Sequence, residues 1–214
     1  MTRIQAGVEF MPNSKYKISM IMEKICESLM QTRNNLAIYQ FLNDQLSSNQ
    51  VNIAPKFFQT ASNAILHEAI LGITRLTDEN QESINFKLLL DMAENHPRLF
   101  KYSPVEVRTL VESNRLRLAD LGMLLKGLRS LRDRKLAHLD RKQLNDPASV
   151  SPEPIQSKDL SHCVDVLTMI LSDLWQAFYG SPFPEDREDS LISRELETLW
   201  MIVGKSVEMM GHSE

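Results

Sequence analysis

SKDLSHCVDVLTMILSDLWQAFYG, residues 157–180, is the stretch of this chain that decides the fold. Its apolar side chains recur every three or four positions, which is the spacing of one face of an α-helix. The stripe consists of Leu160, Val164, Leu167, Leu171, Leu174 and Phe178. Ser157 is a suitable N-cap and Gly180 a suitable helix stop, so the stretch predicts a helix with one buried face.

The same periodicity continues upstream. Residues 14–46, 55–77 and 83–94 each carry an apolar stripe of helical spacing. In the first of these segments the stripe is Ile18, Met22, Ile25, Leu29 and Leu36. Gly72 lies within the second segment, where a glycine lowers helix stability unless another helix packs close to it.

Two further helical segments complete the pattern. One begins at Pro104, with Ser103 as its N-cap, and runs to about residue 142 with Gly122 as a candidate break. The other covers about 186–210, and its expected inward residues are Ile192, Leu196, Leu199, Val203, Val207 and Met210. All nine prolines lie between or at the ends of these segments, and no stretch alternates as a strand would. We therefore expect an all-α bundle of about five or six helices.

The segments divide the chain into three parts. Residues 1–13 are expected to be a flexible N-terminal arm and 14–180 a single helical domain. Residues 181–214 would form a C-terminal helix that packs on the same domain or at a dimer interface. With 43% apolar residues the chain is globular, and it is long enough to bury a core without disulfides or metal.

The composition also limits where the protein acts. No uncharged apolar run approaches the ~20 residues that cross a bilayer, and the N-terminal residues do not resemble a secretory signal. The two cysteines are far apart and lack metal-ligand spacing. We expect a cytoplasmic protein with no membrane association, no metal and no cofactor.

Charge is concentrated in one region of the chain. Residues 115–142 carry nine basic and three acidic residues, a local charge of +6, so the remainder carries −10 and the net charge is −4. Such a basic stripe on an acidic body can hold phosphates at one place. The simpler interpretation, a solvated helix face, applies about as often to a charge run of this kind.

The stretch LRSLRDRKLAHLDR, Leu128 to Arg141, contains Arg132 followed by Asp133 and, six positions after the arginine, His138. On a helical wheel Arg132 and His138 take places whose heptad neighbours are leucines. An unpaired charge is costly to bury, so Arg132 requires a partner or a wet cleft. Asp133 points in another direction on a regular helix and is therefore not automatically its partner.

An arginine and a histidine that share a groove have the parts for cleaving RNA. A histidine can remove the proton of the 2′-hydroxyl, and a guanidinium can stabilise the negative charge that develops on the phosphorane. Basic residues around the pair would position the RNA backbone; they are Lys126, Arg129, Arg134, Lys135 and Arg141. The spacing of Arg132 and His138 alone is weak evidence, because arginines are frequent in the chain.

The surroundings of this pair resemble a known family. The stretch LRSLRDRKLAHLD is similar to the signature of the HEPN superfamily of ribonucleases, and ILGITRLTDENQESINFKLLLDM resembles a second block of its AbiU-like branch, named for phage abortive-infection proteins. That block contains Arg75 and Asp78. A helix ending in Tyr179-Gly180 also looks similar, so the resemblance covers roughly residues 14–180.

The resemblance implies a helical, usually dimeric protein, often a metal-independent endoribonuclease of toxin–antitoxin or phage-defence systems. Arg132, His138 and Asp133 match its active positions, although Asp133 replaces a more usual asparagine and would repel phosphate. Arg75 and Asp78 either form a surface pair or supply a group that reaches Arg132 or Asp133 and orients the site. The expected partners are RNA, a second copy of the chain and a cognate antitoxin protein. A non-catalytic interaction module that binds RNA or a protein is the main alternative, and a purely structural scaffold is the third.

Overall fold

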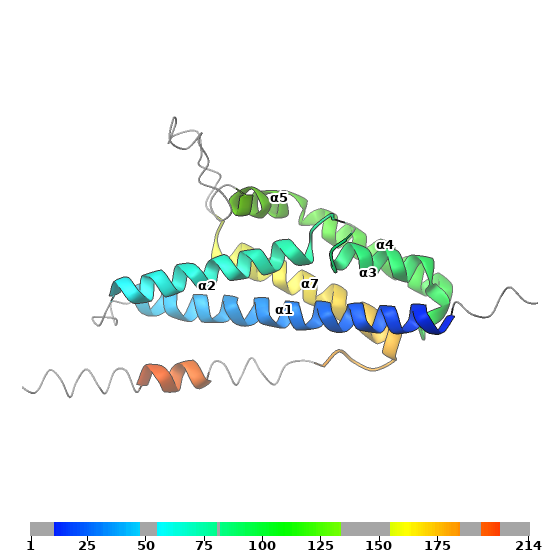
Figure 1. Ribbon diagram of the computed structural model, residues 1–214, viewed down its shortest axis with the longest axis horizontal. Helices are drawn as coiled ribbons and strands as arrows, with labels where there is room; N and C mark the ends of the chain where they lie inside the picture. The colour runs from blue at the N-terminus through cyan, green and yellow to red at the C-terminus, as the bar shows by residue number, and fades with distance from the viewer. Residues whose placement is uncertain (1–10, 48–54, 81, 134–154, 185–193, 202–214) are drawn as a thin grey trace, which may run out of the picture.

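The computed structural model describes residues 11–47, 55–80, 82–133, 155–184 and 194–201 (Figure 1). The described residues are helical or irregular, with no strand among them, which confirms the all-α prediction. The elements are α1 Met11–Ser47, α2 Pro55–Leu76, α3 Phe86–Asn95, η1 Pro97–Leu99, α4 Pro104–Asp120, α5 Gly122–Leu131 and α7 Ser157–Tyr179. A short helical segment follows at 194–201.

The long helices α1 and α2 form an antiparallel pair along the length of the bundle (Figure 1). Helix α7 packs against α1, and α3 and α4 cover one end of the pair. Helix α5 continues from α4 and contacts α2, and its Arg129 reaches the residues that follow Leu76. This arrangement carries the basic end of α5 toward the turn that follows α2.

The predicted stripes of α1 and α7 form the centre of the core. Every residue of both stripes is buried, which confirms the periodicity on which the fold was predicted. Cys163 of α7 is buried with them, and burial raises the pKa of its thiol to about 12. A thiol with this pKa is protonated at neutral pH, so Cys163 acts as an apolar core residue.

Gly72 lies where α2 crosses α1 most closely. A Cβ atom at this position would lie 2.1 Å from Oγ1 of Thr32 on α1. Thr32 is itself buried, and its hydroxyl donates to the carbonyl of Ser28 at 2.7 Å. Gly72 therefore allows a helix–helix contact that no larger residue could make, which confirms the sequence-based condition for a glycine in this helix.

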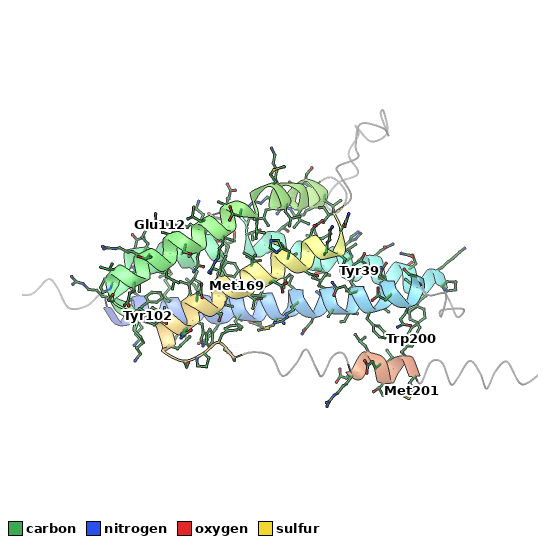
Figure 2. All side chains as sticks on the ribbon, turned by 180° about the vertical axis from the view of Figure 1, so that it is seen from behind. Tyr39, Tyr102, Glu112, Met169, Trp200 and Met201 are labelled. Carbon is green, nitrogen blue, oxygen red and sulfur yellow. The ribbon has the colours of Figure 1, made fainter. Side chains whose placement is uncertain are left out.

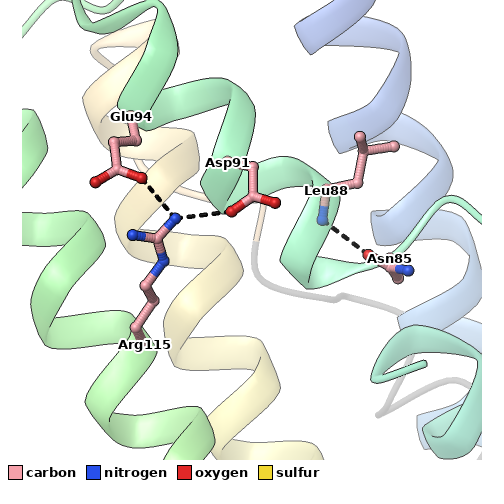
Figure 3. Close-up of polar contacts among 5 residues, drawn as sticks. All are labelled: Asn85, Leu88, Asp91, Glu94 and Arg115. Atoms are coloured by element: carbon pink, nitrogen blue, oxygen red, sulfur yellow. Dashed lines mark hydrogen bonds and ion pairs between the residues drawn. The ribbon is translucent and has the colours of Figure 1, made fainter. Parts of the chain in front are cut away.

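Polar contacts hold the short helix α3 in place (Figure 3). Asn85 is its N-cap and accepts a hydrogen bond from the backbone of Leu88 at 2.8 Å. Nη2 of Arg115 on α4 donates to Asp91 and to Glu94 on α3, at 2.7 Å each. Arg115 thus fixes α3 against α4, and its hydrogen bond holds the pKa of the Glu94 carboxyl below its usual range.

Helix α4 begins and ends as predicted, whereas α7 is capped differently. Ser103 caps α4 through a capping box with Glu106, and a break at Leu121 separates α4 from α5 next to Gly122. The predicted cap Ser157 is instead the first residue of α7, and Gln156 takes the cap position. The hydroxyl of Ser157 accepts a hydrogen bond from Gln40 of α1 at 3.0 Å.

The described part of the C-terminal helix faces the bundle with a different side from the one predicted. Leu199 was expected to be buried but is 58% exposed. Trp200, one position later, packs its ring edge-on against Phe41 of α1 and Phe58 of α2. The large aromatic ring thus takes the inward position, and Leu199 turns outward by about 100°. Figure 2 shows Trp200 beside the bundle, and the limits predicted for the three domains remain predictions.

None of the helices in the described ranges is long and apolar enough to cross a bilayer.

Candidate functional site

Helix α5 delivers the basic segment to a defined place on the bundle. Leu125 and Leu128 are buried, and Leu124 and Leu131 pack partly against the core. These leucines fix the rotation of α5, because their side chains form the single apolar face of the helix. Lys126 lies on the opposite, exposed face.

Arg132 lies at the end of α5 with its side chain 26% exposed. Its Nε donates to Oδ1 of Asp133 at 2.7 Å. Asp133, which the sequence did not make the automatic partner of Arg132, is therefore a partner in the structure. The helix widens into a π-type turn at 132–133, which changes the directions of consecutive side chains from those of a regular α-helix.

The carboxylates near Arg132 keep it charged. The hydrogen bond to Asp133 is the largest cause that raises the pKa of Arg132, against the opposing effect of partial burial. The charge of Asp133 and then the charge of Asp78 raise it further. Arg132 is therefore a fixed cation that remains reachable from solvent.

The effect of Asp78 on the pKa of Arg132 bears on the two roles considered for Arg75 and Asp78, a surface pair or a group that orients the site. Asp78 lies just beyond the end of α2, and it is close enough to Arg132 to stabilise the cation through space. Arg75 is exposed and forms no ion pair within the described ranges. Of the two residues, Asp78 is the one whose charge acts on Arg132, as the smallest of the causes that raise its pKa.

Arg129 connects α5 to the end of α2. Its Nη1 donates to Oε1 of Glu79 at 2.8 Å, and its Nη2 donates to the backbone carbonyl of Thr77. The carbonyls at a helix C-terminus lack intrahelical donors and carry partial negative charge, so a guanidinium there is favourable. The side chain of Arg129 is 28% exposed, and both of its Nη groups are used within the protein. This geometry makes Arg129 an anchor between α5 and the end of α2, and the phosphate contact predicted for it stays a prediction.

Four of the candidate residues, Arg134, Lys135, His138 and Arg141, lie outside the described residues. The pairing of Arg132 with His138 therefore stays a prediction, as does the phosphate-binding role of the other three. Within the described ranges, no three His, Cys, Asp or Glu side chains form a group that could hold a metal ion.

Sequence reasoning missed the contribution of Thr77 and Glu79. The backbone carbonyl of Thr77 leaves no signal in the sequence, because every residue carries one. Glu79 had a detectable signal, since it is an acidic residue that follows a helix end in the same block as Asp78. An acidic turn of this kind is a suitable place for the arginines of a neighbouring basic helix.

Comparison with known families agrees with this arrangement. The HEPN-superfamily model described as AbiU2 matches residues 17–191. The chain belongs to the AbiU2 family. The match includes the Arg75–Asp78 block, the basic end of α5 and the whole of α7. No curated protein and no solved structure matches the chain.

Membership in the AbiU2 family confirms the predicted superfamily and its AbiU-like branch, and it agrees with the helical fold. The protein is thus a HEPN-type protein of an abortive-infection family. The family assignment covers the segment with Arg132 and His138 without establishing that this segment cleaves RNA.

Proposed function

We propose that this AbiU2 protein is a metal-independent endoribonuclease. The observation that carries the proposal is Arg132, a partly exposed cation held at the end of α5 by Asp133 and close to Asp78. A guanidinium fixed in this way is prepared to bind a phosphate and to stabilise the extra negative charge of a phosphorane.

His138 supplies the proton transfers in this proposal. It accepts the proton of the 2′-hydroxyl, and the 2′-oxygen forms a bond to the adjacent phosphorus. The bond from phosphorus to the 5′-oxygen breaks, and that oxygen takes a proton from the imidazolium. The products are a 2′,3′-cyclic phosphate end and a 5′-hydroxyl end, so DNA is not cut by this route.

The proposal includes a two-fold homodimer in the cytoplasm. In a symmetric dimer each chain would bring its Arg132 and His138 to a shared groove, which provides two histidines for the two proton transfers. Lys126, Arg134, Lys135 and Arg141 would position the RNA backbone. A cognate antitoxin protein is the partner that would keep the enzyme inactive.

A non-catalytic interaction module is the second candidate function. The ion pair between Arg132 and Asp133 favours it, because Asp133 occupies one donor of the arginine and repels phosphate. In this alternative the same helix would bind RNA or a partner protein without cutting RNA.

The deciding experiment is cleavage of structured RNA in the presence of EDTA. We expect the parent protein to produce 2′,3′-cyclic phosphate ends. His138→Ala should lower the rate about 100-fold or more, which is the usual size of a general acid–base contribution. His67→Ala and Arg108→Ala are matched controls on α2 and α4 and should leave the rate unchanged. Cleavage that requires magnesium, or a His138→Ala protein as active as the parent, would contradict the proposal. RNA binding without cleavage by the parent would support the interaction module.

A further inference from the structure

A groove lies at the end of the bundle where α1 begins and α7 ends. We call it the end groove, and its volume is about 750 Å³. Three separate parts of the chain form it: the start of α1, the turn between η1 and α4, and the end of α7. The lining residues are Lys15, Tyr16, Ser19, Leu99, Lys101, Phe178 and Tyr179.

Basic and aromatic residues are neighbours in the sequence of two segments that form the end groove. Lys15 and Lys17 flank Tyr16 on α1, and Lys101 precedes Tyr102, which marks this end of the bundle in Figure 2. Lys15 and Lys101 are exposed, and within the described ranges neither amine forms an ion pair. Two such amines at one groove are available for anionic groups.

The aromatic floor of the end groove is rigid. The Tyr179 ring packs against Trp175 at 4.4 Å and Phe178 at 4.9 Å between ring centroids. Its hydroxyl is hydrogen-bonded to Ser19 at 2.8 Å and lies 3.5 Å from Oε1 of Glu23. The carboxylate of Glu23 also accepts a hydrogen bond from Ser19 at 3.0 Å, so it lies beside both hydroxyls. The Tyr179 ring is thus held in place before any ligand arrives.

Gly180 determines where the amine of Lys101 emerges. The glycine has a left-handed backbone with φ 71°, and the Lys101 side chain lies 3.4 Å from the position that a Cβ would occupy. The backbone N–H of Lys101 donates to the carbonyl of Ala177 at 2.7 Å. Tyr179, which the proposed cleavage does not use, lines the end groove, and Gly180 leaves room for the Lys101 side chain beside it.

We propose that the end groove binds single-stranded RNA away from the cleavage site. The Tyr16 and Tyr179 rings would stack on bases, while Lys15 and Lys101 hold the phosphates between them. Grooves that bind single strands combine these two features, because every base has a stackable face and the backbone is uniformly charged. Tyr16 is 71% exposed, which suits a base of a passing strand better than an enclosed small ligand.

This inference rests on the proposed function in taking RNA as the ligand, but its test does not depend on cleavage. The probe is a fluorescent 2′-O-methyl RNA strand of about 16 nucleotides, a length within the range of single-strand sites. Such a strand has no 2′-hydroxyl and cannot be cut by the proposed route. Binding is measured by fluorescence anisotropy with the full chain over a series of salt concentrations.

Two variants remove the proposed contacts. Tyr16→Ala should weaken binding about tenfold, whereas Tyr16→Phe keeps the ring and should bind like the parent. Lys15→Glu/Lys101→Glu should weaken binding and reduce the slope of log affinity against log salt by about 1.4, at ~0.7 for each lost phosphate contact. Lys56→Glu/Lys87→Glu makes the same change of charge on α2 and α3 and is the matched control.

The outcomes distinguish strand binding at the end groove from a general charge effect and from a small-molecule site. Parent-like binding by Tyr16→Ala and by the groove double variant, with unchanged thermal unfolding, would overturn the inference. An equal loss in the control double variant would also overturn it, because it would show that charge alone governs binding. A free mononucleotide that binds as tightly as the strand would indicate a small-molecule site instead. Strand binding at the end groove by a protein that never cleaves RNA would refute only the proposed function.

Discussion

The contact between α1 and α2 and the contact between α2 and α5 are built from different interactions. At Gly72 and Thr32 the first pair approaches so closely that a single added methyl group would clash. The second pair meets through Arg129 of α5, which binds the carbonyl of Thr77 and the carboxylate of Glu79 after the end of α2. Close packing holds the fold, whereas a few polar contacts at the surface position the candidate site. The two can therefore be altered separately.

The strongest way to break the packed contact is Gly72→Ala. The added methyl group would meet the Thr32 hydroxyl at 2.1 Å, so the helices must move apart. We expect the free energy of unfolding to fall by about 1–3 kcal/mol, as for other overpacked cores. Chemical denaturation measures the loss. Gly122→Ala is the matched control, because a Cβ there has open space. An equal loss in both variants would show that backbone effects, not the clash, cause it.

Arg129→Ala tests the polar contact between α2 and α5. It removes hydrogen bonds to Thr77 and Glu79 from a partly exposed side chain, so we expect only about 1 kcal/mol of lost stability. The loss of cleavage rate, converted to a free energy, should exceed the loss of unfolding free energy. The reason is that Arg132 is only three residues away on the same helix. RNA cleavage and denaturation, measured on the same samples, compare the two effects.

Arg129→Lys sharpens this test. Lysine keeps the charge but lacks the planar fork that reaches two acceptors. We expect kcat of Arg129→Lys to be as low as that of Arg129→Ala, while KM stays near the parent value. The reason is that the arginine positions the site without holding RNA. A change confined to KM would show that Arg129 contacts RNA directly, as the sequence alone suggested.

Asp133→Asn weakens the contact between Arg132 and residue 133 without shortening the side chain. The carboxylate raises the pKa of Arg132 and competes with phosphate for it. An asparagine keeps a hydrogen-bond acceptor without the charge, so RNA should bind severalfold more tightly, by up to about tenfold. Anisotropy with uncleavable RNA measures the change. Weaker binding would show that Asp133 holds Arg132 in its productive position.

Arg115→Gln extends the comparison to an exposed polar contact away from the site. Arg115 holds the pKa of Glu94 below 4.5, so the pair contributes stability above this pH and loses it as pH falls toward the lowered pKa. We expect parent and variant to differ slightly near neutral pH and to converge as the pH falls through the lowered pKa of Glu94. Thermal unfolding from acidic to neutral pH measures this. A difference that grows at low pH would contradict the expected sign.

The sequence predicts the packed part of this protein better than its polar contacts. The buried stripes of α1 and α7, the capping residue Ser103 and the close approach at Gly72 follow from periodicity and from the special properties of serine, proline and glycine. These features repeat along the chain or depend on near neighbours, so a single sequence contains them.

The polar contacts have no such pattern. The pairing of Arg132 with Asp133 depends on a local widening of the helix, and the partners of Arg129 depend on where α2 ends in space. Leu199 and Ser157 show the same difficulty, because their neighbours in the sequence take the positions expected of them. The placement of His138 remains a prediction that lies outside the described residues.

The acceptor that Arg129 uses at Thr77 belongs to the main chain. Substitutions at position 77 can change the side chain but cannot delete this oxygen. An arginine at position 129 would therefore keep its hydrogen bond to this oxygen when the residues of the turn are substituted during evolution. The condition is that α2 still ends at the same place. Mutational scanning at position 77 should accordingly find broad tolerance, limited by burial alone.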